Sequence, residues 1–105
     1  MNEYRVSERL DGGCVLWVQG ELDLATVDAF RDRALACLER ADSLDLDLQG
    51  VSFIDSSGLA VLVLLRNRAA LSGKAVSLVN VSPATRRLLE ITGLQGSFDI
   101  RPSQV

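Results

Sequence analysis

The chain has 105 residues, of which 48% are hydrophobic and 24% charged, with 14 acidic and 11 basic side chains and a formal net charge of −3. This length allows one hydrophobic core, so residues 1–105 are expected to form a single domain. Direct nucleic-acid binding is not expected, because the charges are interspersed and the nearest basic groups, Arg66 with Arg68 and the pair Arg86-Arg87, are explained as solvated helix surface.

The absence of histidine excludes several kinds of active site. Neither Ser-His-Asp nor Cys-His catalysis is available, and a zinc site would need carboxylates and two distant thiols. Gly12, Gly13 and Gly20 are not followed by the signature of a phosphate-binding loop. We therefore expect no enzyme activity, no metal and no cofactor, and we expect Cys14 and Cys37 to be buried free thiols.

No segment of the chain predicts a secretory signal or a membrane span. The N-terminal sequence MNEYRVSERLDGG lacks a basic region followed by an apolar stretch. The longest apolar run, Leu59 to Leu65, is far shorter than the roughly 20 residues that a membrane-spanning helix needs. We expect a cytoplasmic protein.

The first half of the chain predicts two strands, a helix and a third strand, identified by hydrophobic period and flanking turn residues. The expected ranges are 4–10 and 14–20 for a β-hairpin, 24–41 for the helix and 44–48 for the third strand, with apolar character continuing past Gly50. Asp23 or Thr26 is the candidate cap of the helix. Trp17 is expected to pack in the core or on a face of the sheet.

The second half of the chain continues the alternation of helices and strands. The expected ranges are 57–71 and 83–92 for helices, 74–80 for a strand and 97–100 for a short edge strand, followed by a loosely ordered tail over 101–105. Ser82-Pro83 is a cap with proline at the first helical position, and Gly93 ends that helix. The order β-β-α-β-α-β-α-β predicts an α/β fold with a mixed sheet and helices packed on it.

The most informative segment is Phe53–Leu65, FIDSSGLAVLVLL, in which a strand-like pair leads through Asp55-Ser56-Ser57-Gly58 into an apolar helix. The backbone N–H groups at a helix start favour negative charge, so a serine there can carry a phosphoryl group without disrupting the helix. These residues also have ordinary structural roles. Asp55 or Ser57 is a candidate cap, and Gly58 permits close backbone approach or serves as a small packing residue.

The first two turns of this helix are more apolar than a single packing face requires. The apolar residues fall on two faces, Leu59, Leu62 and Val63 on one, and Ala60, Val61 and Leu64 on the other. A helix on one side of a sheet buries only one face fully. Either neighbouring helices cover the second face, or it meets a partner.

Three segments together resemble the STAS domain: Gly20-Glu21-Leu22-Asp23, Leu46-Asp47-Leu48 with Phe53 to Leu59, and Ser82-Pro83. The resemblance covers nearly the whole chain and implies a mixed four- to five-stranded sheet with helices mainly on one face. The form Asp-Ser-Ser-Gly-Leu at 55–59 is similar, more narrowly, to the single-domain anti-sigma factor antagonists of bacteria.

This narrower resemblance implies a function. An unphosphorylated antagonist binds an anti-sigma factor serine kinase and frees a sigma factor, and phosphorylation of the serine after the loop aspartate, here Ser56, ends binding until a serine phosphatase removes the phosphate. The implied partner-binding residues are Asp23, Asp55, Ser57, Gly58 and Leu59. From the residues alone, Ser57 remains an alternative acceptor.

Two other functions remain open on the sequence. One is a STAS scaffold module in a sensory or lipid-transport assembly, without a phosphorylation cycle. The other is nucleotide binding or hydrolysis by the loop 55–58, which lacks a recognisable general base and a phosphate-cradling glycine loop.

Overall fold

Five strands form one mixed sheet, in the order β1-β2-β3-β4-β5, in the computed structural model, which describes residues 2–102. The strands are β1 (Glu3–Glu8), β2 (Gly13–Leu22), β3 (Ser43–Ile54), β4 (Ala75–Val79) and β5 (Asp99–Arg101). The helices are α1 (Val27–Arg40), α2 (Ser56–Leu71) and α3 (Pro83–Thr92), with the short 3₁₀ helix η1 (Gln95–Ser97). β1 pairs with β2 in antiparallel fashion and the other pairs are parallel, which confirms the predicted fold class.

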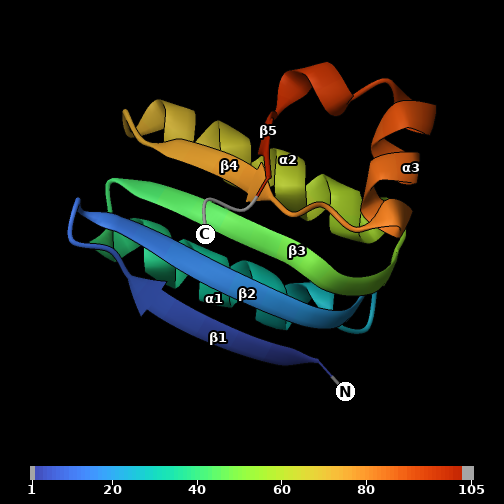
Figure 1. Cartoon of the computed structure of the whole chain (residues 1–105), viewed down its shortest axis with the longest axis horizontal. Helices are drawn as coiled ribbons and strands as arrows, with labels where there is room; N and C mark the ends of the chain where they lie inside the picture. Colours follow the sequence, from blue (N-terminus) through green and yellow to red (C-terminus); the bar gives the residue numbers. More distant parts are fainter. Residues whose placement is uncertain (1, 103–105) are drawn as a thin grey trace.

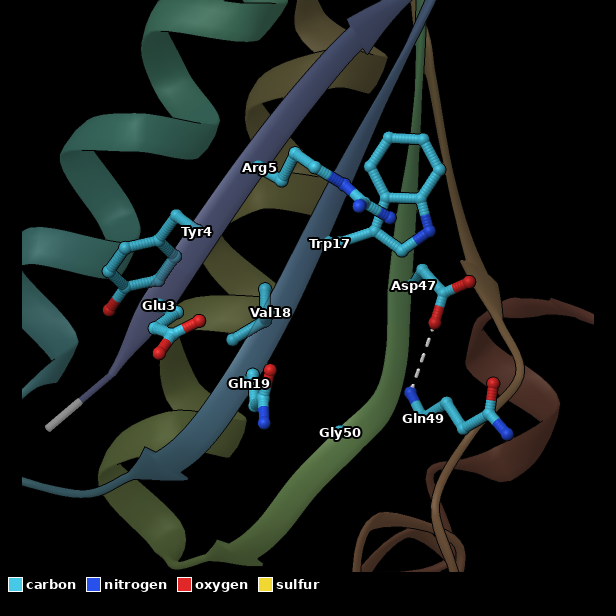
Figure 2. Close-up of a pocket in the computed structure, with 9 residues that line it drawn as sticks. All are labelled: Glu3, Tyr4, Arg5, Trp17, Val18, Gln19, Asp47, Gln49 and Gly50. Carbon is cyan, nitrogen blue, oxygen red and sulfur yellow. Dashed lines mark hydrogen bonds between the residues drawn. The ribbon is translucent and has the colours of Figure 1, made fainter.

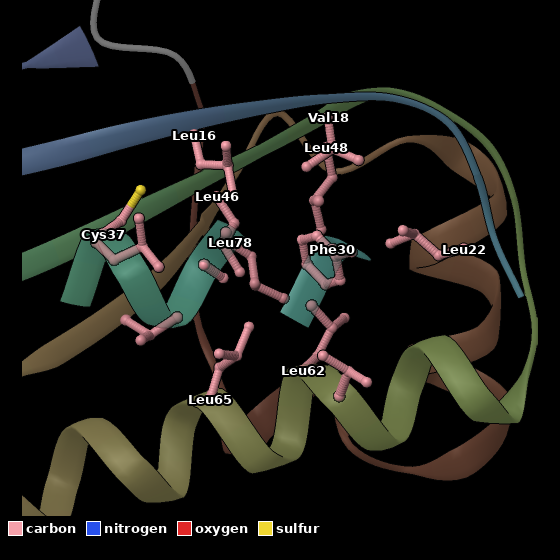
Figure 3. Close-up of a cluster of buried hydrophobic side chains, with 14 of the residues drawn as sticks. Leu16, Val18, Leu22, Phe30, Cys37, Leu46, Leu48, Leu62, Leu65 and Leu78 are labelled. Carbon is pink, nitrogen blue, oxygen red and sulfur yellow. The ribbon is translucent and has the colours of Figure 1, made fainter. Parts of the chain in front are cut away.

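Helices α1 and α2 cover one face of the sheet, and the hydrophobic core lies between them and the strands (Figure 1). Alternate residues of β2 and β3 point into this core, where they meet side chains of both helices (Figure 3). The fully buried side chains include Leu16, Leu46 and Leu48 from the strands, with Phe30, Leu62 and Leu65 from the helices, and Val18 is 2% exposed. None of the helices within residues 2–102 is long and apolar enough to cross a membrane.

Strand β3 extends to Ile54, well beyond the alternating segment 44–48 that the sequence marks as a strand. The register between β2 and β3 shifts between Trp17 and Gln19, and again between Gly20 and Glu21. Such irregularities add a residue to one strand and break its two-residue period, which is why alternation stops before the strand does. The added length carries β3 past the end of β4, and α3 packs against it (Figure 1).

The start of α1 is later than predicted, at Val27 rather than Leu24. The residues before it form a turn in which the carbonyl of Asp23 accepts hydrogen bonds from the N–H groups of Thr26 and Val27, both at 3.0 Å. Thr26 occupies the N-cap position, but its hydroxyl donates to the carbonyl of Glu21 at 2.7 Å and caps nothing. The predicted Thr26 side-chain cap is therefore wrong.

Helix α3 has the predicted limits. The Ser82 hydroxyl accepts a hydrogen bond from the N–H of Thr85 at 3.3 Å, Pro83 is the first helical residue, and Gly93 ends the helix with a φ of 73°. A left-handed residue at this position favours glycine. These features were readable from sequence because capping is a local interaction.

The C-terminal prediction needs correction. The last strand is β5, and Arg101, which the sequence places in a loose tail, belongs to it. The carbonyl of Arg101 accepts the N–H of Asn80 at 3.1 Å, and its guanidinium lies 2.9 Å from the carboxylate of Asp45. Asp45 is only 7% exposed and also pairs with Arg9, since a buried carboxylate requires cationic partners. Residues 103–105 of the predicted tail lie outside the described residues.

Both cysteines are buried free thiols, as predicted, Cys14 on β2 and Cys37 on α1. Burial, together with the neighbouring Cys37 thiol, raises the pKa of Cys14 from 9.0 to about 11. Because the thiolate is the reactive form, Cys14 is protected from thiol chemistry at neutral pH.

We expect Cys14 in the folded protein to react slowly with a thiol reagent at pH 8. A rise in pKa from 9 to 11 lowers the thiolate fraction at this pH from about one tenth to about one thousandth. The measurement is the rate at which the two buried thiols of the wild-type protein react with a chromogenic disulfide, native and in denaturant. Equal rates in the two conditions would contradict the buried, protonated thiol.

Candidate functional site

Two loops meet at the edge of the sheet where β2 and β3 end. The strands are parallel and Leu22 lies opposite Ile54, so Asp23 and Asp55 follow at neighbouring positions. The N–H of Asp55 donates to the carbonyl of Leu22 at 3.1 Å, which ties the second loop to the first. The fold thus brings together two segments that are distant in the sequence and that both contribute predicted site residues.

Asp55 is the N-cap of α2. Its Oδ1 accepts hydrogen bonds from the backbone N–H groups of Ser57, at 2.8 Å, and Gly58, at 3.3 Å. Two donors at the helix start are thereby satisfied. The alternative in which Ser57 caps the helix is wrong, and the N–H groups that a nucleotide phosphate would need at this loop are occupied by Asp55.

Ser56 is the first residue of α2, one position earlier than the predicted helix start, and it is exposed. Ser57 is half-buried. Within residues 2–102, neither hydroxyl forms a hydrogen bond. Of the two candidate acceptors, Ser56 is the more accessible to a modifying enzyme.

Gly58 lies where α2 approaches the end of β2 most closely. A Cβ atom here would lie 2.7 Å from the carbonyl oxygen of Leu22 and 2.8 Å from Cγ1 of Ile54. This confirms the close-approach interpretation, because even alanine would clash with the backbone of β2. Leu59, the next residue, is 7% exposed and packs into the core. Gly58 and Leu59 therefore hold the helix start in place.

Asp23 lies beside this helix start and is partly exposed. Its Oδ1 accepts hydrogen bonds from the N–H of Ala25 at 3.0 Å and from the hydroxyl of Thr26 at 3.2 Å, so it stabilises the turn before α1 and is not a helix cap. With Glu21 and Asp55 it makes the two loops acidic. No lysine or arginine occurs in residues 20–28 or 49–65.

Two exposed apolar side chains near this site were not expected from the sequence. Leu24 is 79% exposed and Phe53 is 47% exposed, on the loop after β2 and near the end of β3. The sequence predicts Leu24 as the first residue of a helix and Phe53 as part of the apolar stretch that continues the third strand. Together they add exposed apolar surface beside the acidic loops.

The division of α2 into two apolar faces is partly corrected by the structure. Val61 is buried, although the sequence places it with Ala60 and Leu64 on the second face. Ala60 is exposed, whereas Val63 and Leu64 are half-buried. The helix therefore has a covered side and a side without cover from the described part of the chain.

A separate hollow of about 540 Å³ lies on the sheet face that α1 and α2 do not cover (Figure 2). Trp17 packs on this face as predicted, with the guanidinium of Arg5 4.6 Å from its ring centroid. Asp47 accepts hydrogen bonds from the N–H of Gln49 at 3.1 Å and the side-chain amide of Asn80 at 3.0 Å. Asp47 and Arg5 of this hollow are thus engaged by the chain itself.

The STAS domain model matches residues 4–104 of the chain. The chain belongs to this family.

Several of its relatives are anti-sigma factor antagonists. The chain is 32% identical over 83 residues to the anti-sigma-B factor antagonist of Bacillus subtilis, an alignment that covers 79% of this chain and 76% of the relative. It is 31% identical over 104 residues to the anti-sigma F factor antagonist of Paenibacillus polymyxa, covering 97% and 86%. The crystal structure of an anti-sigma factor antagonist from Mycobacterium paratuberculosis is similar with a TM-score of 0.87 and 30% identity, covering 99% and 88%.

The Gly58→Ala substitution should destabilise the protein by about 1–3 kcal/mol, the usual effect of overpacking, because its new methyl group meets the backbone of β2. The matched control is Gly96→Ala, where an added Cβ has no neighbour within 4 Å. Urea unfolding of both variants measures the difference. A Gly58→Ala protein as stable as the control would mean that α2 does not need this close approach.

Proposed function

We propose that this protein is an anti-sigma factor antagonist that binds an anti-sigma factor kinase when Ser56 is unphosphorylated, and so frees a sigma factor. The observation that carries the proposal is the exposed Ser56 hydroxyl directly after the N-cap Asp55 of α2. Relatives named anti-sigma-B and anti-sigma F factor antagonists support it.

The switch operates through charge on a preformed surface. Phosphorylation adds roughly 1.5 to 2 negative charges to Ser56, beside the carboxylates of Glu21, Asp23 and Asp55. A partner that fits a neutral serine would then meet electrostatic repulsion and a desolvation penalty. The positive end of the α2 dipole favours a phosphate at this position, so binding reverses while the helix stays intact.

In this proposal the remaining site residues have two different roles. Asp23, Asp55 and Ser57 contact the partner around Ser56, whereas Gly58 and Leu59 hold the start of α2 in position, a role supported by their burial and close packing. In this function the chain is the substrate of a serine kinase and of a serine phosphatase, and is not itself an enzyme. It acts in the cytosol through protein contacts, without binding nucleic acid directly.

The Ser56→Ala substitution should abolish phosphorylation and retain kinase binding, because it removes only the hydroxyl. Ser56→Asp should weaken binding tenfold or more, since it adds a fixed charge. Ser57→Ala should still accept one phosphate. The measurement is intact mass and affinity with purified anti-sigma factor kinases of the host, with and without ATP. An affinity that is unchanged by ATP and by both Ser56 substitutions would instead favour the scaffold function.

The Asp55→Asn substitution removes the negative charge of Asp55 and keeps a side chain that can cap α2. Asparagine caps helices about as well as aspartate, so the stability should change by less than about 0.5 kcal/mol, whereas Asp55→Ala should lose about 1 kcal/mol. If the Asp55 carboxylate orients Ser56 for the kinase, Asp55→Asn should slow phosphorylation about tenfold or more. Unchanged phosphorylation kinetics in Asp55→Asn would restrict Asp55 to capping.

A further inference from the structure

The side of α2 that faces away from the sheet carries an open groove of about 330 Å³. The residues that line it recur at the helical spacing of three and four: Ala60, Val63, Leu64, Asn67, Arg68 and Leu71. Leu71 is 86% exposed, an unusual position for a leucine near the end of a well-formed helix. We call this surface the α2 groove.

The first turns of α2 carry more apolar residues than one packing face of a helix requires. Leu62 and Leu65 point from α2 into the core, as Figure 3 shows, and α1 packs along one flank. On the helix surface near η1, Arg66 lies 5.3 Å from the ring centroid of Phe98. Along the α2 groove, Val63 and Leu64 are only half-buried and Leu71 is exposed, so residues 2–102 leave part of its apolar surface uncovered, as is typical of a surface that meets a partner.

The α2 groove continues from Ser56 along the same helix face. Ser56, Ala60, Val63 and Asn67 are spaced by four, three and four residues, which aligns them on one side of an α-helix. Leu71, at the far end, is about 22 Å from Ser56 at a rise of roughly 1.5 Å per residue. A protein that covers Ser56 is therefore positioned to extend along the groove.

The two ends of the α2 groove carry opposite charge. Asp23 and Asp55 lie at the Ser56 end, whereas Arg68 is exposed at the far end and forms no ion pair with any residue in 2–102. The complementary surface would have basic groups near Ser56, an apolar middle, and an acidic group near Arg68.

We propose that the α2 groove docks an amphipathic helix of the anti-sigma factor kinase, with its apolar face on Val63, Leu64 and Leu71 and an acidic side chain opposite Arg68. This inference rests on the proposed function and adds a second contact region to it. Docking remote from Ser56 holds the kinase on its substrate in both ground state and transition state.

The test compares Leu71→Asp with Leu10→Asp. Leu10 is fully exposed in the β1–β2 turn, at the end of β2 opposite to Ser56, so its substitution is a matched control for charge and lost apolar surface. Affinity and steady-state phosphorylation are measured with the purified kinase that modifies Ser56. We expect Leu71→Asp to raise both Kd and the KM for the antagonist about tenfold or more with kcat unchanged, and Leu10→Asp to match wild type. Arg68→Glu should act in the same direction as Leu71→Asp.

The docking proposal would be overturned if wild type, Leu71→Asp and Arg68→Glu bound the kinase with equal affinity and had equal melting temperatures. The proposed phosphorylation switch would not be affected by that result. A wild-type dimer in sedimentation that Leu71→Asp dissociates would overturn it as well, by assigning the groove to a second copy of this chain. If wild type itself neither binds nor accepts phosphate from any host kinase, the proposed function fails, and the docking proposal fails with it.

Discussion

The close approach of α2 to the end of β2 is the constraint on which the rest of the site depends. Gly58 lies against the carbonyl of Leu22 with no room for a Cβ atom, and the N–H of Asp55 donates to that same carbonyl. One carbonyl oxygen thus fixes both the helix start and the loop before it. Because β2 and β3 are parallel here, this contact also places Asp23 beside Asp55 and leaves Ser56 facing solvent.

The proposed phosphorylation switch at Ser56 needs no conformational change. The donors at the start of α2 are already satisfied by Asp55, and the helix dipole tolerates added negative charge, so a phosphate on Ser56 changes what a partner meets and leaves the fold as it was. The exposed Leu24 and Phe53 supply apolar contact on the same surface. In the proposed function, this apolar contact surface lies next to the serine that controls binding.

The open face of the sheet and the α2 groove differ in how far their side chains are paired or packed within the chain. On the open sheet face, the buried carboxylate of Asp45 is paired with Arg9 and Arg101, and Trp17 is stacked with Arg5. The α2 groove has no comparable cover, and Leu71 projects from it. Unburied apolar surface keeps its hydrophobic driving force for association, whereas polar groups already paired within the chain offer less to a partner.

The sequence by itself determined the order of the strands and main helices and the limits of α3, because hydrophobic period, Ser82-Pro83 capping and glycine stops are local properties. Tertiary structure decided the features that depend on distant residues. The bulged register with β2 continues β3 beyond its alternating segment. Arg101 lies in β5, where it pairs with the buried carboxylate of Asp45. The packing of α1 and the sheet against α2 decides which apolar side of α2 stays exposed. Local pattern specifies which residues form a helix, and only the packed neighbours specify which of its faces is left for a partner.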